Sequence, residues 1–264
     1  MVTAPDGVRL FVEDQGTGRP VVLLPGLGDA GWVWRLQRVA VGQVARAIVV
    51  DSRGLGRSDR PPAPYSIGRM AQDVAAVVVD AGGGPAVVVG ASMGGFVAAT
   101  LAVLRPDLVR GLVLVATSVG GPGSVPVPDD VRAACLAASD RSPEEFVRAT
   151  MPLSFSADWP TEHRERYEEL VAARLESATP MESWRTQYDA CEAFLSVGLP
   201  PGDVEVPTWV VHGVHDAVIP FENAEVTRRR IPHAELVDLN AGHLCWFERP
   251  HLVNRLLVEA AETR

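Results

Sequence analysis

The sequence predicts an α/β protein: a mostly parallel, doubly wound sheet with a helical cap inserted into it. Short β-branched runs alternate with helix-like segments through the first 120 residues, which is typical of right-handed βαβ units. At 264 residues, 47% of them apolar, the chain is long enough to bury one large core. A proline- and glycine-rich segment at residues 120–128 then interrupts the alternation, and strand signals resume after residue 202.

Hydrophobic runs and turn residues define the expected elements. We expect strands at residues 8–13, 21–24, 47–50, 86–89 and 112–116, and helices at 32–41, 67–80 and 93–104. After residue 202 we expect a strand at 208–211, a helix, a strand at 236–239 and a last helix from Pro250. Buried strands that alternate with helices indicate a parallel sheet covered on both faces.

Residues 121–203 differ from the rest of the chain in charge and pattern. They include 15 acidic and 7 basic residues, so this segment accounts for −8 of the net charge of −9. Residues 142–145 (Ser-Pro-Glu-Glu) and 179–182 (Thr-Pro-Met-Glu) both match a capping box with proline at the first helical position. We therefore predict a helical cap at 121–203, inserted into a core formed by 1–120 and 204–264.

The motif Gly-Ala-Ser-Met-Gly at residues 90–94 is the most informative stretch of the chain. It lies between a buried strand pattern and a helix pattern, which is the setting of a nucleophile elbow. In such a turn the serine has a strained backbone, and side chains at the flanking positions would collide with the neighbouring strand and helix. Ser92 is therefore the candidate nucleophile, and the alternative is an ordinary strand-to-helix turn.

A serine nucleophile needs a base to take its proton and an acid to orient that base. Asp216 follows the expected strand at 208–211, and His243 follows the expected strand at 236–239. The carboxyl ends of parallel strands meet at one edge of a sheet. We therefore predict that Ser92, Asp216 and His243 form a catalytic triad.

Acyl transfer also needs two preorganised donors for the oxyanion of the tetrahedral intermediate. The backbone amide of Met93 directly follows the nucleophile and is the first candidate. The second is the amide of Leu27, in the loop that follows the expected strand at 21–24.

Five motifs together resemble the α/β-hydrolases, in particular their compact, lid-bearing esterase and lactonase group. They are Leu-Pro-Gly-Leu-Gly at 24–28, Asp-Ser-Arg-Gly-Leu-Gly-Arg-Ser at 51–58, the elbow at 90–94, His-Gly-Val-His-Asp at 212–216 and Gly-His at 242–243. One departure is visible, because many relatives have His-Gly where this chain has Pro-Gly. The resemblance implies a serine hydrolase that works through an acyl-enzyme, without a cofactor, and assigns the segment at 51–58 a structural role.

The expected substrate is the ester or lactone of a neutral, largely apolar small molecule. An acidic cap disfavours anionic substrates, although one local arginine such as Arg185 would still serve to bind them. Four tryptophans, Trp32, Trp159, Trp184 and Trp246, are candidate pocket residues, since their large faces hold apolar groups. Each of them is equally compatible with an ordinary core position.

Two motifs suggest other chemistry. His212, His215 and Asp216 offer metal ligands, but they lie at a strand end rather than on one helix face, so we assign no metal. Residues 26–31 form Gly-x-Gly-x-x-Gly, and Asp51 follows near the spacing of a ribose-binding acid. A dinucleotide site would leave the elbow, Asp216 and His243 unexplained.

Two other functions remain open within the same fold. Some of its members hydrolyse carbon–carbon bonds of dienoic diketo acids with the same serine and histidine. The other is a ligand sensor that retains the triad and works through cap movement and a partner. Fast turnover of simple esters would favour the enzyme, and tight binding without turnover would favour the sensor.

Composition excludes several function classes. All 24 basic residues are arginine, so there is no lysine for a Schiff base, a P-loop or a Ser-Lys pair. Three widely spaced cysteines fit neither a disulfide framework nor a zinc site. The acidic chain is a poor nucleic-acid binder. Because the sequence shows no leader pattern and no apolar run of membrane length, we expect a cytoplasmic protein with no membrane partner. We also expect a monomer or a homodimer.

Overall fold

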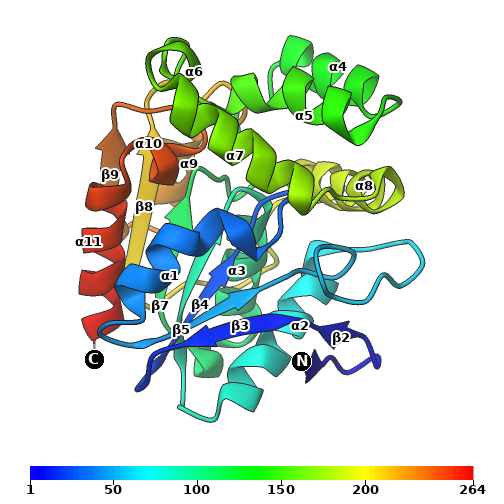
Figure 1. The fold of residues 1–264 in the computed structure, drawn as a ribbon. Coiled ribbons are helices and arrows are strands. Elements are labelled where there is room, and N and C mark those ends of the chain that lie inside the picture. The colour runs from blue at the N-terminus through cyan, green and yellow to red at the C-terminus, as the bar shows by residue number, and fades with distance from the viewer. Residues whose placement is uncertain (264) are drawn as a thin grey trace.

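A computed structural model describes residues 1–263, and in them seven strands form one central sheet (Figure 1). The order is β3-β5-β4-β6-β7-β8-β9; β3 is antiparallel to β5, and all other neighbours are parallel. These strands are β3 (Val12–Gln15), β4 (Pro20–Leu24), β5 (Arg46–Val50), β6 (Ala86–Ala91), β7 (Val109–Val115), β8 (Thr208–Gly213) and β9 (Glu235–Leu239). A separate antiparallel pair consists of β1 (Val2–Thr3) and β2 (Arg9–Leu10). The predicted fold class is confirmed.

Helices cover both faces of the sheet. They are α1 (Arg35–Val41), α2 (Ile67–Ala81), α3 (Met93–Leu104), α9 (Glu222–Arg230), α10 (Cys245–Glu248) and α11 (Pro250–Glu262), with short 3₁₀ turns η1 (Gly31–Trp34) and η2 (Pro106–Leu108). α1 and α11 pack together on one face, and α2, α3 and α9 lie on the other. Each face of the sheet has its own apolar core, and alternate residues of β4 contribute to both. Val21 and Leu23 belong to the core that contains residues of α11, while Val22 and Leu24 belong to the core that contains residues of α3. A strand buried on both faces is a continuous apolar run, which made it recognisable in the sequence.

Helices are the only regular elements between β7 and β8, and they lie over the carboxyl ends of the strands (Figure 1). It contains α4 (Asp129–Ala138), α5 (Pro143–Thr150), η3 (Met151–Ser154), α6 (Trp159–Glu162), α7 (Arg164–Glu176) and α8 (Met181–Val197). We call these the cap helices. Within residues 1–263, no helix combines the length and the apolar character needed to cross a bilayer.

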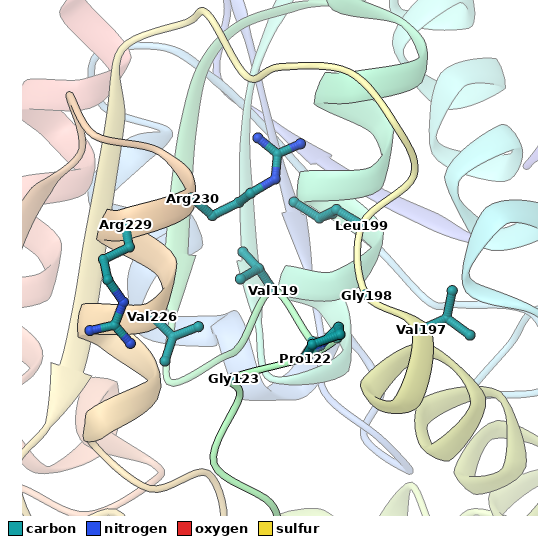
Figure 2. Close-up of a pocket in the computed structure, with 11 residues that line it drawn as sticks. Val119, Pro122, Gly123, Val197, Gly198, Leu199, Val226, Arg229 and Arg230 are labelled. Atoms are coloured by element: carbon teal, nitrogen blue, oxygen red, sulfur yellow. The ribbon is translucent and has the colours of Figure 1, made fainter.

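The two connections to the cap helices run side by side. The amide of Leu199 donates to the carbonyl of Val119 at 3.1 Å. A Cβ on Gly120 would lie 3.0 Å from the Cα of Gly198, so glycine permits this close approach. Figure 2 shows the surface pocket of about 360 Å³ beside them, with Val226, Arg229 and Arg230 of α9 on its other wall. This pocket shares no lining residue with the cavity at Ser92 described below.

The prediction of one continuous strand at residues 8–13 is wrong, because the structure divides this segment between β2 and β3. The amide of Phe11 donates to Ser58 Oγ at 2.8 Å instead of joining a ladder. The residues before it pair with β1, and those after it pair with β5. A side chain 47 positions away therefore divides the strand, which local patterning does not reveal.

The capping box at 142–145 is confirmed, but the one at 179–182 is wrong. Ser142 and Glu145 exchange the two expected bonds at the start of α5. In contrast, Thr179 Oγ1 donates to the carbonyl of Gly28 at 2.8 Å, and Pro180 is the N-cap of α8 rather than its first residue. The sequence also indicated only two helix starts here. It missed α4, α6 and α7, none of which has a side-chain cap.

Replacing Gly90 by alanine should destabilise the protein by about 2 kcal/mol or more, because the new Cβ would lie 2.1 Å from the carbonyl oxygen of Gly94. Urea unfolding measures the change. Gly68 of α2 is the matched control, since a Cβ there meets nothing within 4 Å. Gly68→Ala should leave stability unchanged or raise it by up to about 1 kcal/mol. Equal effects at both glycines would contradict the crowding argument.

Candidate active site

Ser92 has the strained backbone expected of an elbow. It lies between β6 and α3 with φ +51° and ψ −120°, a conformation that costs free energy in any residue with a side chain. Its amide donates to Val115 O at 2.9 Å, and its carbonyl accepts from Thr117 Oγ1 at 2.7 Å. A Cβ on Gly94 would lie 2.4 Å from the carbonyl oxygen of Leu24. The turn therefore depends on glycine at its flanks and on bonds from β7 and the segment after it.

The two amides predicted for the oxyanion have no protein acceptor. Within residues 1–263, neither the Leu27 nor the Met93 N–H donates to a backbone or side-chain group. Both residues adjoin Ser92: Met93 follows it at the start of α3, and Leu27 lines the same cavity. Unpaired amides beside a nucleophile are available to an anionic oxygen.

Cap helix α8 and Thr179, two residues before it, hold the loop that contains Leu27. The amide of Gly28 donates to Gln187 Oε1 at 3.2 Å, and Gln187 Nε2 donates to the carbonyl of Arg53 at 3.0 Å. Thr179 Oγ1 donates to the carbonyl of Gly28 from the other side. Because Gln187 is fully buried, these bonds are shielded from water. The orientation of the Leu27 amide therefore depends on the docking of α8.

Asp216 and His243 form a buried pair at the carboxyl ends of β8 and β9. His243 Nδ1 and Asp216 Oδ2 are 2.8 Å apart, and the two side chains are 8% and 0% exposed. The other oxygen, Oδ1, accepts from the amides of Val218 and Ile219, each at 2.9 Å. Both carboxylate oxygens are thus hydrogen-bonded, so the aspartate is fixed as an acceptor for the imidazole.

The environment of Asp216 keeps it ionised. Burial alone would raise the pKa of its carboxyl group, but attraction to His243 and the hydrogen bonds from His212 and His243 outweigh it and lower the pKa to about 2. His212 Nε2 lies 2.9 Å from the carbonyl of Ile219 and 3.2 Å from Asp216 Oδ2. Since both neighbours are acceptors, this nitrogen must bear the hydrogen. His212 is therefore a buried donor that positions Asp216.

Ser92 and His243 face the same cavity without being hydrogen-bonded to each other. Both line it together with Gly26 and Leu27. Among residues 1–263 no hydrogen bond joins Ser92 Oγ to the ring of His243. Catalytic hydrogen bonds are often long in unliganded enzymes and tighten when substrate binds.

A second buried carboxylate holds the loop that precedes His243. Glu248 of α10 is 5% exposed, and its Oε1 accepts from the amides of Gly242 and Ser156, each at 2.9 Å. Its Oε2 accepts from the hydroxyl of Ser156 at 2.6 Å. Because Ser156 belongs to the segment between η3 and α6, this carboxylate connects the histidine loop to the cap helices.

Ser92 lies at the junction of two small chambers under the cap helices. One, of about 110 Å³, is lined by several polar side chains and is called the polar chamber. The other, of about 80 Å³, is lined mainly by apolar groups and is called the apolar chamber. Residues shared by both are Leu27, Ser92, Cys135, Trp184 and Val218. The two chambers therefore meet at Ser92.

Only two of the four predicted tryptophans line these chambers. Trp184 borders both, and Trp246 borders the polar chamber while its Nε1 donates to the carbonyl of Val33 at 3.0 Å. Trp32 instead stacks on Phe247, and Trp159 lies between the rings of Phe155 and His163. The prediction that Trp32 and Trp159 line the pocket is therefore not supported, since both pack against other aromatic rings.

Arg185, the example of an arginine that would bind an anionic substrate, lines neither chamber. Arg185 is turned away from the chambers and bonds to Ser139 and Asp140. Arg174 of α7 lines the polar chamber, as does Asp29, which directly follows the loop residue Gly28. No motif identified these two residues, although Arg174 is one helical turn from Leu170 on the buried side of α7.

The alternative motifs have structural partners. Asp51, proposed as a ribose-binding acid, accepts from the amides of Gly31 and Arg57 at 2.7 and 2.9 Å. His215 Nε2 is 2.8 Å from Asn240 Oδ1, while His212 faces Asp216. In the described part of the chain, no three His, Cys, Asp or Glu side chains are grouped as a metal ion would require.

Comparison with known proteins identifies the family. The sequence profile of the family described as alpha/beta hydrolase fold matches residues 19–250. The chain belongs to this family. RutD of Azorhizobium caulinodans, which is named as a carbamate hydrolase, is 31% identical over 252 residues, or 94% of this chain and 93% of RutD. The predicted family resemblance is thus confirmed, and membership supports hydrolase activity.

Solved structures of family members agree with this assignment. An esterase from Exiguobacterium antarcticum superimposes with a TM-score of 0.82 at 25% identity, covering 99% of this chain and 98% of that one. Est816, described as an N-acyl homoserine lactone degrading enzyme, gives a TM-score of 0.78 at 30% identity, covering 97% and 98%. The family therefore includes esterase and lactone-degrading structures that match nearly the whole chain.

The low pKa of Asp216 should make stability depend on acidity. The pKa is about 2 in the fold and about 3.9 in an unfolded chain. The stabilisation is therefore complete above about pH 5 and is lost as the pH falls toward 2. In Asp216→Asn, the free energy of unfolding should fall by about 2 kcal/mol less than in the wild type as the pH is lowered across this range. Urea unfolding at each pH measures this. Asp189→Asn, at an exposed position of α8, should retain the wild-type dependence of stability on pH. If both variants flattened this dependence equally, the acid-induced loss could not be assigned to Asp216.

Removal of the Glu248 carboxylate should destabilise the histidine loop. Glu248→Ala leaves the amides of Gly242 and Ser156 unpaired, which should lower the free energy of unfolding by about 2 kcal/mol or more and reduce kcat. Glu248→Gln keeps one acceptor oxygen and should restore most of both. Denaturation and a hydrolase assay measure the effects, with exposed Glu259→Ala of α11 as the control. Wild-type kcat in Glu248→Ala would contradict a positioning role.

Proposed function

We propose that the protein is a serine hydrolase that cleaves a carboxylic ester or lactone through an acyl-enzyme. One observation supports this most strongly. One edge of the sheet brings together a strained serine, a buried aspartate–histidine pair and two amides without acceptors among residues 1–263. Ser92, His243 and Leu27 also line one cavity. Nucleophile, base, orienting acid and oxyanion donors are the parts that acyl transfer requires.

In the first half of the proposed reaction, Ser92 Oγ attacks the carbonyl carbon while His243 Nε2 takes its proton. Asp216 accepts a hydrogen bond from His243 Nδ1, which fixes the tautomer and stabilises the imidazolium. The Leu27 and Met93 amides hold the oxyanion. The tetrahedral intermediate then collapses, the alkoxide leaves and His243 gives it the proton, so that an acyl group remains on Ser92.

In the second half, water replaces the alcohol. His243 takes a proton from the water, whose oxygen attacks the acyl-enzyme carbonyl, and the same two amides hold the second oxyanion. Collapse releases a carboxylic acid and returns the proton to Ser92. For a lactone, both product groups are on one molecule, a hydroxy acid. Each step uses side chains of this chain alone.

The proposed substrates are small. The two chambers are about 110 and 80 Å³, which suits a compact acyl group on one side of Ser92 and a compact leaving group on the other. The similar esterase and the lactone-degrading Est816 support the ester and lactone classes. In this proposal, residues 121–203 form the cap that excludes water from the reaction, with Trp184 and Trp246 in the substrate pocket.

Ser92→Ala should lower kcat for nitrophenyl esters by on the order of 10⁴ to 10⁶. A screen of nitrophenyl esters of rising chain length beside a panel of lactones finds the substrate class. A fluorophosphonate probe should add to Ser92 in the wild type, as mass spectrometry of the peptide would show. Ser196→Ala, an exposed serine of α8, is the control and should keep full activity and labelling.

Two results would refute the proposal. Activity that survives in Ser92→Ala would exclude the nucleophile. Tight binding of esters by the wild type without turnover would instead favour a ligand sensor.

A further inference from the structure

The polar chamber contains an ion pair that the proposed mechanism does not use. Arg174 Nε of α7 lies 3.3 Å from Asp29 Oδ1, and both side chains are only 13% exposed. Both residues line the chamber with Ser92 and His243. A charge pair in the wall of a substrate cavity contacts whatever occupies that cavity.

The pair has unused hydrogen-bonding capacity of both kinds. Asp29 Oδ1 is buried and accepts no hydrogen bond. Within residues 1–263, the guanidinium of Arg174 makes this ion pair but no hydrogen bond. Burial raises the pKa of Asp29, although attraction to Arg174 and His243 opposes it. The two groups thus meet as an ion pair without a hydrogen bond, so a ligand with one acceptor and one donor would satisfy both.

Gly26 shows how near this pair is to the nucleophile. A Cβ on Gly26 would lie 3.4 Å from Ser92 Cβ and 3.8 Å from Asp29 Oδ2. The Asp29 carboxylate and the serine are thus separated by the space of a single glycine. A substrate group bound by the pair would therefore lie near the carbonyl that Ser92 attacks.

We propose that Arg174 and Asp29 form a subsite for a neutral secondary amide adjacent to the scissile carbonyl of the substrate. The amide carbonyl accepts from the Arg174 guanidinium, and the amide N–H donates to Asp29 Oδ1. This inference rests on the proposed ester or lactone hydrolysis and specifies its substrate class: acyl groups with an acylamino substituent next to the reacting carbon.

Charge explains why a neutral group fits better than an ionic one. A carboxylate would bind Arg174 but would lie beside the Asp29 carboxylate, and an ammonium group would meet the opposite conflict. A hydrocarbon would leave the acceptor and the donors unpaired. A secondary amide has one acceptor and one donor on neighbouring atoms, so it pairs with both without adding charge.

Four nitrophenyl esters of nearly equal length test the subsite. The N-acetylglycine ester has the amide, and the 4-oxopentanoate ester keeps its carbonyl but lacks its N–H. The pentanoate ester has neither group, and the hydrogen succinate ester has a carboxylate. For each ester, kcat/KM is divided by the rate constant of its hydroxide hydrolysis, which removes differences in intrinsic reactivity.

The wild type should prefer the acetylglycine ester over the pentanoate ester by about tenfold or more, because two hydrogen bonds to ionised groups are gained. The 4-oxopentanoate ester should fall between them. Equal normalised values for acetylglycine and pentanoate, or a preference for hydrogen succinate, would overturn the inference while leaving ester hydrolysis intact. Failure to hydrolyse any of the four esters would overturn both this inference and the proposed function.

Variants then assign the preference to the pair. Arg174→Met should reduce the acetylglycine-to-pentanoate ratio to near one, and Arg174→Gln, which keeps an N–H donor, should retain part of it. Arg185→Met is the matched control, since that cap arginine bonds to Asp140 outside the chambers, and it should retain the wild-type ratio. An unchanged ratio in folded Arg174→Met, checked by thermal unfolding, would exclude Arg174 from the subsite.

Discussion

The close approach of backbone around Ser92 is the constraint on which the rest of the site depends. A Cβ at Gly90 would overlap the carbonyl oxygen of Gly94, and one at Gly94 would overlap that of Leu24. This crowding lets β6 turn directly into α3 with Ser92 at φ +51°. Both oxyanion candidates result from the same geometry, because Met93 starts α3 and the loop after β4 passes beside it. The surrounding sheet must stabilise the fold enough to maintain this strain.

Two buried carboxylates hold His243 at the cavity that Ser92 also lines. Asp216 orients the imidazole of His243, and Glu248 holds the backbone just before it. Within residues 1–263, neither carboxylate forms an ion pair with an arginine, and the sequence contains no lysine. Their partners are amides, a hydroxyl and imidazoles, which hold a carboxylate in place without bringing a second permanent charge into the site. Since Glu248 also binds Ser156, one side chain links the cap segment to the histidine loop.

Local signals in the sequence predicted the sheet and the three residues at its edge. Ser92, Asp216 and His243 each follow a strand whose pattern is short and apolar, so topology alone brings them to one edge. The cap was less predictable. Thr179 and Gln187 bond to the loop at Gly28, and Arg174 pairs with Asp29, because helices more than a hundred residues away dock there. Such contacts depend on helix orientation, which propensity and capping signals do not encode. Trp32 and Trp159 illustrate the same limit, since ring stacking places them outside the chambers.

A crystal structure of the protein after reaction with a small alkyl fluorophosphonate would show whether these groups act together, because the adduct has the tetrahedral shape of the acyl-transfer intermediate. We expect phosphorus bonded to Ser92 Oγ, the phosphoryl oxygen within about 3.2 Å of both the Leu27 and Met93 amides, and His243 Nε2 within hydrogen-bonding distance of Ser92 Oγ or the alkoxy oxygen. A phosphoryl oxygen directed away from both amides, or an imidazole that stays out of reach of the adduct, would contradict the proposed mechanism.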